Sequence, residues 1–110
     1  MTQPEALQRV ERNRKILEAT PENRLARFAL ANALFESGAV QDAADEYRRC
    51  LQAQPDWMAV AISLGRCLVL TGRLEEARET LRAARALAVN QGHSSPLAEI
   101  DELVSRCGGA

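Results

Sequence analysis

The amino-acid sequence predicts an all-α protein built as a stack of antiparallel helix pairs, with about six helices in total. Residues 21–88 carry one pattern twice, because Pro21, Leu30 and Gly38 each recur as the same residue type 34 positions later. The composition is rich in Ala, Leu, Glu and Arg, which are good helix formers. Only four aromatic residues are present and runs of β-branched residues are nearly lacking, which argues against a sheet.

The first three helices are predicted over residues 4–19, 22–37 and 40–53. Pro4 suits the first turn of a helix. Pro21 stops the first helix, because the residue before a proline disfavours the helical conformation. Gly38 can adopt the left-handed conformation that ends the second helix. The apolar positions of the second and third helices are Leu30, Ala31, Leu34, Phe35, Ala43, Ala44, Tyr47, Cys50 and Leu51.

The last three helices are predicted over residues 57–71, 74–89 and 95–107. Asp56 is the predicted N-cap of the fourth helix, which is apolar almost all round and should be covered on nearly every side. Gly72 ends that helix, and Ser95 is the predicted N-cap of the sixth. The fifth helix should direct a polar face to water, formed by Arg78, Glu79, Arg82 and Arg85.

A repeated unit of 34 residues with two helices resembles the tetratricopeptide repeat, as found in small bacterial-type domains of that family. The register gives repeats at 24–57 and 58–91, with the helices at 4–19 and 95–107 as terminal caps of a single domain spanning 1–110. The resemblance implies a right-handed superhelical stack. Its small positions are Ala31, Ala43, Gly65 and Ala77, and its large ones are Leu34, Tyr47, Leu68 and Leu81. Arg27 departs from the pattern, because a large residue is common there.

Charge and hydropathy exclude several classes of protein. The net charge of −1 provides no overall field for nucleic acid or an anionic membrane. The apolar runs are too short for a membrane-spanning helix, and no basic-then-apolar leader is seen, so we expect a cytoplasmic protein. Cys50, Cys67 and Cys107 are expected to be free thiols in a reducing compartment.

The sequence shows no recognisable active site. His93 is the only histidine and lies in a polar loop, and no phosphate-binding or hydrolase motif is present. Cys50 and Cys67 are predicted to be packing residues, whereas Cys107 is expected to be exposed and oxidisable. A basic cluster at 9–15 is interpreted as a solvated helix face, because glutamates are interleaved with it. We therefore expect no enzyme, no cofactor, no metal and no small-molecule substrate.

The resemblance implies that the first helix of each repeat lines a concave, protein-binding groove. The groove residues implied in this way are Leu25, Phe28, Asn32, Phe35, Ile62, Arg66, Val69 and Leu70. Some relatives hold a partner's C-terminal carboxylate with Lys and Asn side chains on this face. Asn32 alone matches that clamp, since Phe28, Ser63, His93 and Leu97 replace its other residues, so this mode is not predicted.

Two functions from different classes remain open at this point. The first is a non-catalytic interaction scaffold that holds a peptide or an amphipathic helix of a protein partner in the groove. The second is a self-association module that pairs the same apolar face with another copy to form a homodimer. The last helix can also pack beside the second repeat and cover part of its groove.

Overall fold

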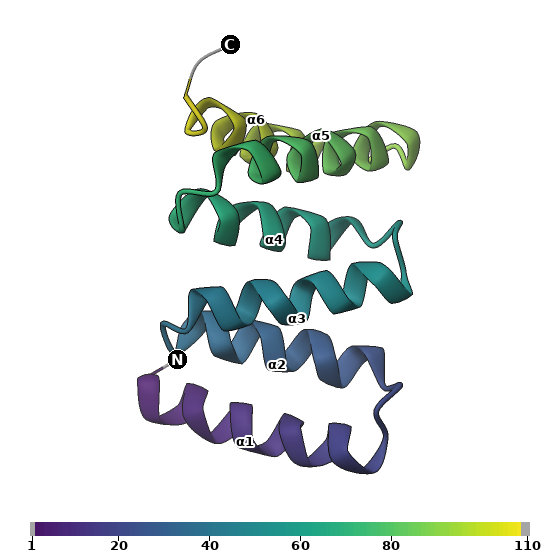
Figure 1. The fold of residues 1–110 in the computed structure, drawn as a ribbon. Coiled ribbons are helices and arrows are strands. Elements are labelled where there is room, and N and C mark those ends of the chain that lie inside the picture. The colour runs from purple at the N-terminus through teal and green to yellow at the C-terminus, as the bar shows by residue number, and fades with distance from the viewer. Residues whose placement is uncertain (1, 109–110) are drawn as a thin grey trace. The chain divides into compact units, whose positions relative to one another are not determined.

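The computed structural model describes residues 2–108, and all regular secondary structure in that range is helical. The helices are α1 (Gln3–Ala19), α2 (Arg24–Glu36), α3 (Val40–Ala53), α4 (Met58–Leu70), α5 (Leu74–Asn90) and α6 (Ser95–Ser105). The chain divides into two compact units, Met1–Pro55 with α1 to α3 and Asp56–Ala110 with α4 to α6. Figure 1 labels these helices. The all-α prediction is confirmed, and the observed helix boundaries lie within two residues of the predicted ones. Treatment of the whole chain as one domain stays a prediction.

Side-chain caps are present where the first two helices begin. The Thr2 hydroxyl accepts from the Glu5 amide at 3.4 Å, and Asn23 Oδ1 accepts from the Ala26 amide at 3.0 Å. The predicted cap at Asp56 is wrong, because α4 begins one residue later and its N-cap is Trp57, which makes no side-chain cap bond. Asp56 occupies the repeat position of Glu22, which also precedes the cap residue.

Glycines end α2, α4 and α5 with the same arrangement of hydrogen bonds. Gly38 has φ +94° and its amide donates to the Phe35 carbonyl, while the next amide donates to Leu34. Gly72 repeats this geometry with φ +76°, as does Gly92 with φ +73°. These left-handed residues satisfy carbonyls that the helix ends leave without partners. The predicted helix ends at Gly38 and Gly72 are confirmed.

In unit 1, α2 packs between α1 and α3. Ala6 and Val10 of α1 are buried, and both Ala31 and Ala43 are fully buried in the α2–α3 pair. Tyr47, which is 2% exposed, is the large residue of α3 in this core. Small residues on one helix and a large one on the other allow the close interdigitation that a dense core needs.

In unit 2, α4 packs against both α5 and α6. A Cβ atom built on Gly65 would lie 2.4 Å from Leu81 Cδ2, so the two helices approach as closely as glycine allows. Seven of the 13 residues of α4 are buried, which agrees with the nearly continuous apolar character of its sequence. Ile100 and Leu103 bury the apolar face of α6.

Three expectations near the end of the chain are corrected. Arg78 does not simply face water, because its Nη2 donates to the carbonyls of Cys107 at 3.2 Å and Gly108 at 3.0 Å. Those carbonyls follow the last turn of α6 and have no helical partner. Cys107, which was expected to be exposed, is only 2% exposed, and its thiol donates to the Leu103 carbonyl of α6 at 3.5 Å. The N-cap of α6 is Ser94 instead of Ser95, and it makes no side-chain cap bond.

Candidate functional site

Four of the predicted groove residues lie along one stripe of α2. Leu25, Phe28, Asn32 and Phe35 are spaced by three, four and three residues, which places them on the same helix face. We call this set the α2 stripe. Leu25 is 73% exposed, and the other three are half-buried. The α2 stripe is therefore reachable from solvent along its length.

Tyr47 of α3 supports the α2 stripe from below. Its hydroxyl donates to Asn32 Oδ1 at 2.5 Å. Its ring lies 6.1 Å from that of Phe28, centroid to centroid, with a 56° tilt between the planes, which is a favourable geometry for an aromatic pair. This hydrogen bond gives the side-chain carbonyl oxygen of Asn32 a partner inside unit 1. It leaves the Nδ2 amino group of Asn32 available as a donor.

The corresponding residues of α4 behave differently. Ile62 is buried and only 7% exposed, so it has little surface to offer to a partner. Arg66 is half-buried and forms an ion pair with Glu99 of α6. Val69 is half-buried, and the neighbouring Leu70 is 51% exposed. Helix α6 thus reaches the polar residue of this face but leaves Leu70 accessible.

The other candidate residues from the sequence do not gather into a site. His93 is exposed, and its amide closes the turn after α5 by donating to the Ala88 carbonyl at 2.8 Å. Within residues 2–108, no three His, Cys, Asp or Glu side chains lie close enough together to hold a metal. Lys15 of the basic cluster pairs with Glu11 at 3.6 Å on an exposed face of α1. Over the same part of the chain, none of the helices has both the length and the apolar character needed to cross a bilayer.

One group of residues was not identified as a site from the sequence. Arg27 of α2 and Arg49 of α3 both bond to the carboxylate of Glu46, at 2.7 Å each. The sequence gives one indication of this group, because Arg27 departs from the repeat pattern at a position where a large residue is common. Glu46 and Arg49 lie on another helix, and the repeat pattern alone does not predict that they lie close to Arg27.

Comparison with solved structures identifies the fold. The TPR2B domain of yeast Sti1, solved as a complex with pHsp70, matches with a TM-score of 0.80 and 21% identity, covering 89% of this chain and 78% of that one. The TPR2AB domain of yeast Sti1, solved as a complex with pHSP90, matches with a TM-score of 0.79 and 21% identity, covering 89% of this chain and 38% of that one. A search of curated protein sequences gave no significant match.

Family models for the tetratricopeptide repeat match two overlapping parts of the chain. One covers residues 34–95 and the other covers residues 5–56. The first spans more than half of the 110 residues, and the second includes α1, which the repeat register had treated as a cap. Neither model describes a catalytic family. The helix pairs, their glycine turns and these matches together show that the chain belongs to the tetratricopeptide repeat family.

Proposed function

We propose that this protein is a non-catalytic interaction scaffold whose α2 stripe holds a peptide or an amphipathic helix of a protein partner. In unit 2, Val69 and Leu70 of α4 offer accessible apolar surface of their own, whereas Ile62 is nearly buried. Asn32 and Arg66 are the polar residues of these faces. The three cysteines are buried and form no disulfide, which favours a reducing compartment such as the cytoplasm.

The observation that carries the proposal is the exposure of Leu25. A leucine that is 73% exposed adds little to the packing of the unit, yet it begins a stripe that continues through two phenylalanines. Large apolar side chains in a row on an accessible helix face are typical of surfaces that bind another protein. The solved complexes of the similar Sti1 domains, named above, support a protein or peptide as the ligand class.

The polar residues suggest how a bound segment would be oriented. The free Nδ2 donors of Asn32 suit a backbone carbonyl of an extended peptide, because Tyr47 holds the amide group in place. Arg66 would have to share its guanidinium with Glu99, since that ion pair already occupies it. We therefore expect the α2 stripe to contribute more binding energy than the α4 residues.

A peptide-display selection against the purified chain tests this proposal. We expect enriched peptides with two or more apolar residues, and we expect Leu25→Glu to weaken their binding at least about tenfold, because a carboxylate would be desolvated in the contact. Leu7→Glu is the matched control, since Leu7 is also an exposed leucine of unit 1, at 53%, but lies on α1. Equal affinities for wild type and Leu25→Glu would contradict the proposal, as would a selection without enrichment.

Homodimerisation is the competing function for the same residues, because an exposed apolar stripe can also pair with itself. Sedimentation equilibrium over a range of protein concentrations separates the two. A protein that stays monomeric up to millimolar concentration supports a foreign partner. A dimer that dissociates in Leu25→Glu but not in Leu7→Glu would replace the peptide proposal by self-association.

A further inference from the structure

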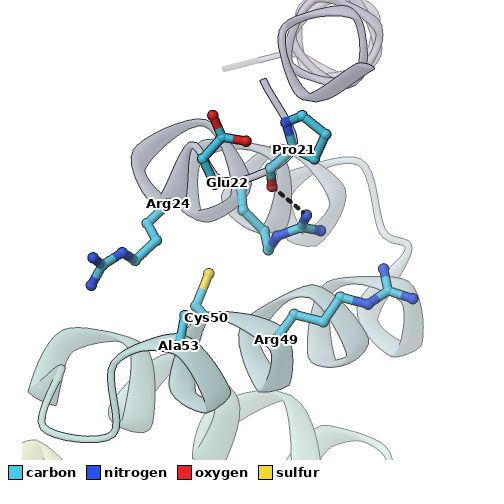
Figure 2. A pocket seen from close by; sticks show the side chains of 7 residues that line it. Pro21, Glu22, Arg24, Arg49, Cys50 and Ala53 are labelled. Atoms are coloured by element: carbon cyan, nitrogen blue, oxygen red, sulfur yellow. Dashed lines mark hydrogen bonds between the residues drawn. The ribbon is translucent and has the colours of Figure 1, made fainter. Parts of the chain in front are cut away.

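A second feature of unit 1 is a pocket of about 320 Å³ between the turn that precedes α2 and the last turn of α3. Three of its lining residues are arginines, namely Arg24, Arg27 and Arg49. Figure 2 shows Arg24 on one side of the pocket and Arg49 on the other, with the Cys50 thiol directed into the space between them. None of the residues of the α2 stripe lines this pocket.

The hydrogen bonds of the three arginines leave the pocket with an excess of positive charge. Arg27 Nη1 and Arg49 Nη1 bond to the two oxygens of the same carboxylate, that of Glu46. Arg24 donates to a neutral group, the amide oxygen of Gln54, at 3.2 Å. With the carboxylate of Glu22 at the rim counted, three cations face two anions.

The remaining groups around the pocket do not cancel this charge. Burial raises the pKa of the Cys50 thiol to about 11, more than the nearby Arg27 guanidinium lowers it, so the thiol is neutral at pH 7. The N-terminus of α2 and the C-terminus of α3 both lie at this end of unit 1, and their helix dipoles have opposite signs. The arginines therefore decide the sign of the local potential.

Unit 2 shows that the repeat fold does not require these charges. The residues 34 positions after Arg24, Arg27, Glu46 and Arg49 are Met58, Ala61, Thr80 and Ala83. None of these four is charged, yet α4 and α5 form the same kind of helix pair as α2 and α3. Partly buried ion pairs give little net stability because desolvation offsets their attraction. The stability of the helix pair thus does not account for this group of charges.

We propose that the pocket is a binding site for an oxyanion, meaning the carboxylate or phosphate group of a ligand. Arginine presents a planar set of N–H donors that matches such groups in a bidentate manner. Arg27 is fixed by its bonds to Glu46 and to the Pro21 carbonyl, so it forms the rigid wall of the site. Arg24 and Arg49 are exposed and can rotate over a bound anion.

Titration of the full chain with inorganic phosphate, followed by nuclear magnetic resonance at constant ionic strength, tests the proposal. We expect saturable shifts of the amides at 22–27 and 49–53 and of the arginine Nε signals. Arg24→Gln combined with Arg49→Gln should weaken binding by about tenfold or more, since charge-assisted hydrogen bonds are lost. Arg82→Gln, at an exposed arginine of α5, is the matched control and should leave binding unchanged.

A variant that removes a negative charge tests the same site through the opposite effect, which is tighter binding of phosphate. Glu46→Gln keeps the shape of the side chain but removes the anion shared by Arg27 and Arg49, so phosphate should bind several-fold more tightly. A parallel titration with acetate distinguishes a site for any oxyanion, if both probes saturate, from one specific to phosphate. Shifts that do not saturate, or that are the same in the double variant as in wild type, would overturn the proposal.

Discussion

Asn32 of α2 bonds to Tyr47 within its own helix pair, whereas the aligned Arg66 of α4 bonds to Glu99 of α6. The residue at this repeat position therefore bonds to the second helix of its own repeat in unit 1, and to the helix that follows the repeat in unit 2. The difference follows from the partners present, because Tyr47 offers a hydroxyl to Asn32 whereas the aligned Leu81 is apolar and Glu99 of α6 offers a carboxylate to Arg66. It leaves an accessible apolar stripe on α2 and a partly covered face on α4.

The aligned large residues Tyr47 and Leu81 differ in a related way. Tyr47 has a hydroxyl that donates to Asn32, while the aligned Leu81 is apolar and packs directly on Gly65. Unit 1 thus combines packing with a polar contact at this position, and unit 2 uses packing alone. The same repeat fold therefore accommodates two packing arrangements, in which the small residue and the large residue both differ between the repeats.

The largest effect is expected at Leu81, because it is fully buried and packs directly on Gly65 where α4 and α5 meet. Leu81→Ala should lower the free energy of unfolding by about 2–5 kcal/mol, as is usual for a buried leucine. Urea denaturation followed by circular dichroism measures this. Leu74→Ala, at a half-buried leucine of α5, should cost clearly less. Equal losses at the two sites would show that Leu81 is not the centre of the pair.

The next effect is a pH dependence of the stability of unit 1 through Cys50. Its folded pKa is raised by burial from 9.0 to about 11, so folding favours the neutral thiol. That contribution is fully present below pH 9 and is lost as the pH rises to about 11. Cys50→Ala, which copies the aligned Ala84, should remove it. Between pH 9 and 11 the stability of wild type should fall more than that of the variant, by on the order of 2 kcal/mol.

Those measurements need a reducing agent, so that thiol oxidation does not contribute. Urea unfolding curves at several pH values give the two stability profiles. Parallel profiles would mean that Cys50 becomes accessible to water before it ionises.

A smaller effect is expected where α4 and α5 approach most closely. Gly65→Ala places a methyl group against Leu81, which is buried and cannot move aside freely. The cost of overpacking, about 1–3 kcal/mol, is offset in part by a gain in helix propensity of about 1 kcal/mol, so a net loss of about 0–2 kcal/mol is expected. The converse change, Ala31→Gly in α2, should cost about 1 kcal/mol from propensity. Stabilisation by Gly65→Ala in thermal unfolding would contradict the close approach.

The polar contact of unit 1 is expected to contribute less. Tyr47→Phe removes the hydroxyl that bonds to Asn32 and should cost about 1 kcal/mol, the usual net value of one hydrogen bond. In an Asn32→Ala background the same change should cost clearly less. A double-mutant cycle by chemical denaturation measures the coupling, and additive losses would indicate that the two residues do not interact.

The smallest effect is expected for the ion pair between Arg66 and Glu99. Both side chains are partly exposed, at 35% and 47%, so Glu99→Gln should cost no more than about 0.2–1 kcal/mol. The loss should shrink further at high salt, because salt screens exposed charges. Comparison of unfolding free energies at low and high sodium chloride checks both points. A large, salt-independent loss would mean that α6 depends on this pair for its position.

The helices and their ends were predictable because their causes are local. Apolar spacing, Pro21, Pro55 and the turn glycines act within a few residues, and all six predicted helices are observed. The errors at Asp56 and Ser95 are one residue in size and concern caps without a side-chain bond. Cys107 was expected to be exposed because it lies near the end of the chain. The sequence did not show that its side chain is buried or that its carbonyl accepts from Arg78.

The candidate site was predictable only in part. The repeat register placed Leu25, Phe28, Asn32 and Phe35 on one face, because helical spacing alone decides which residues share a face. It did not show that Ile62 is buried, which depends on tertiary packing, or that Arg66 is paired, which depends on where α6 packs. Nor did it bring Arg24, Arg27 and Arg49 to one pocket, since they come from two helices.

The order of residues along the chain thus determined the repeat, its helices, its turns and the residue types on each helix face. These properties arise from interactions between residues close in sequence, which a single chain displays directly. Tertiary structure decided which of those faces stay open to a partner. It also decided which charges are shared, as Glu46 is shared between Arg27 and Arg49. Burial and pairing depend on residues far apart in sequence, and a repeat pattern does not show which of these residues come into contact.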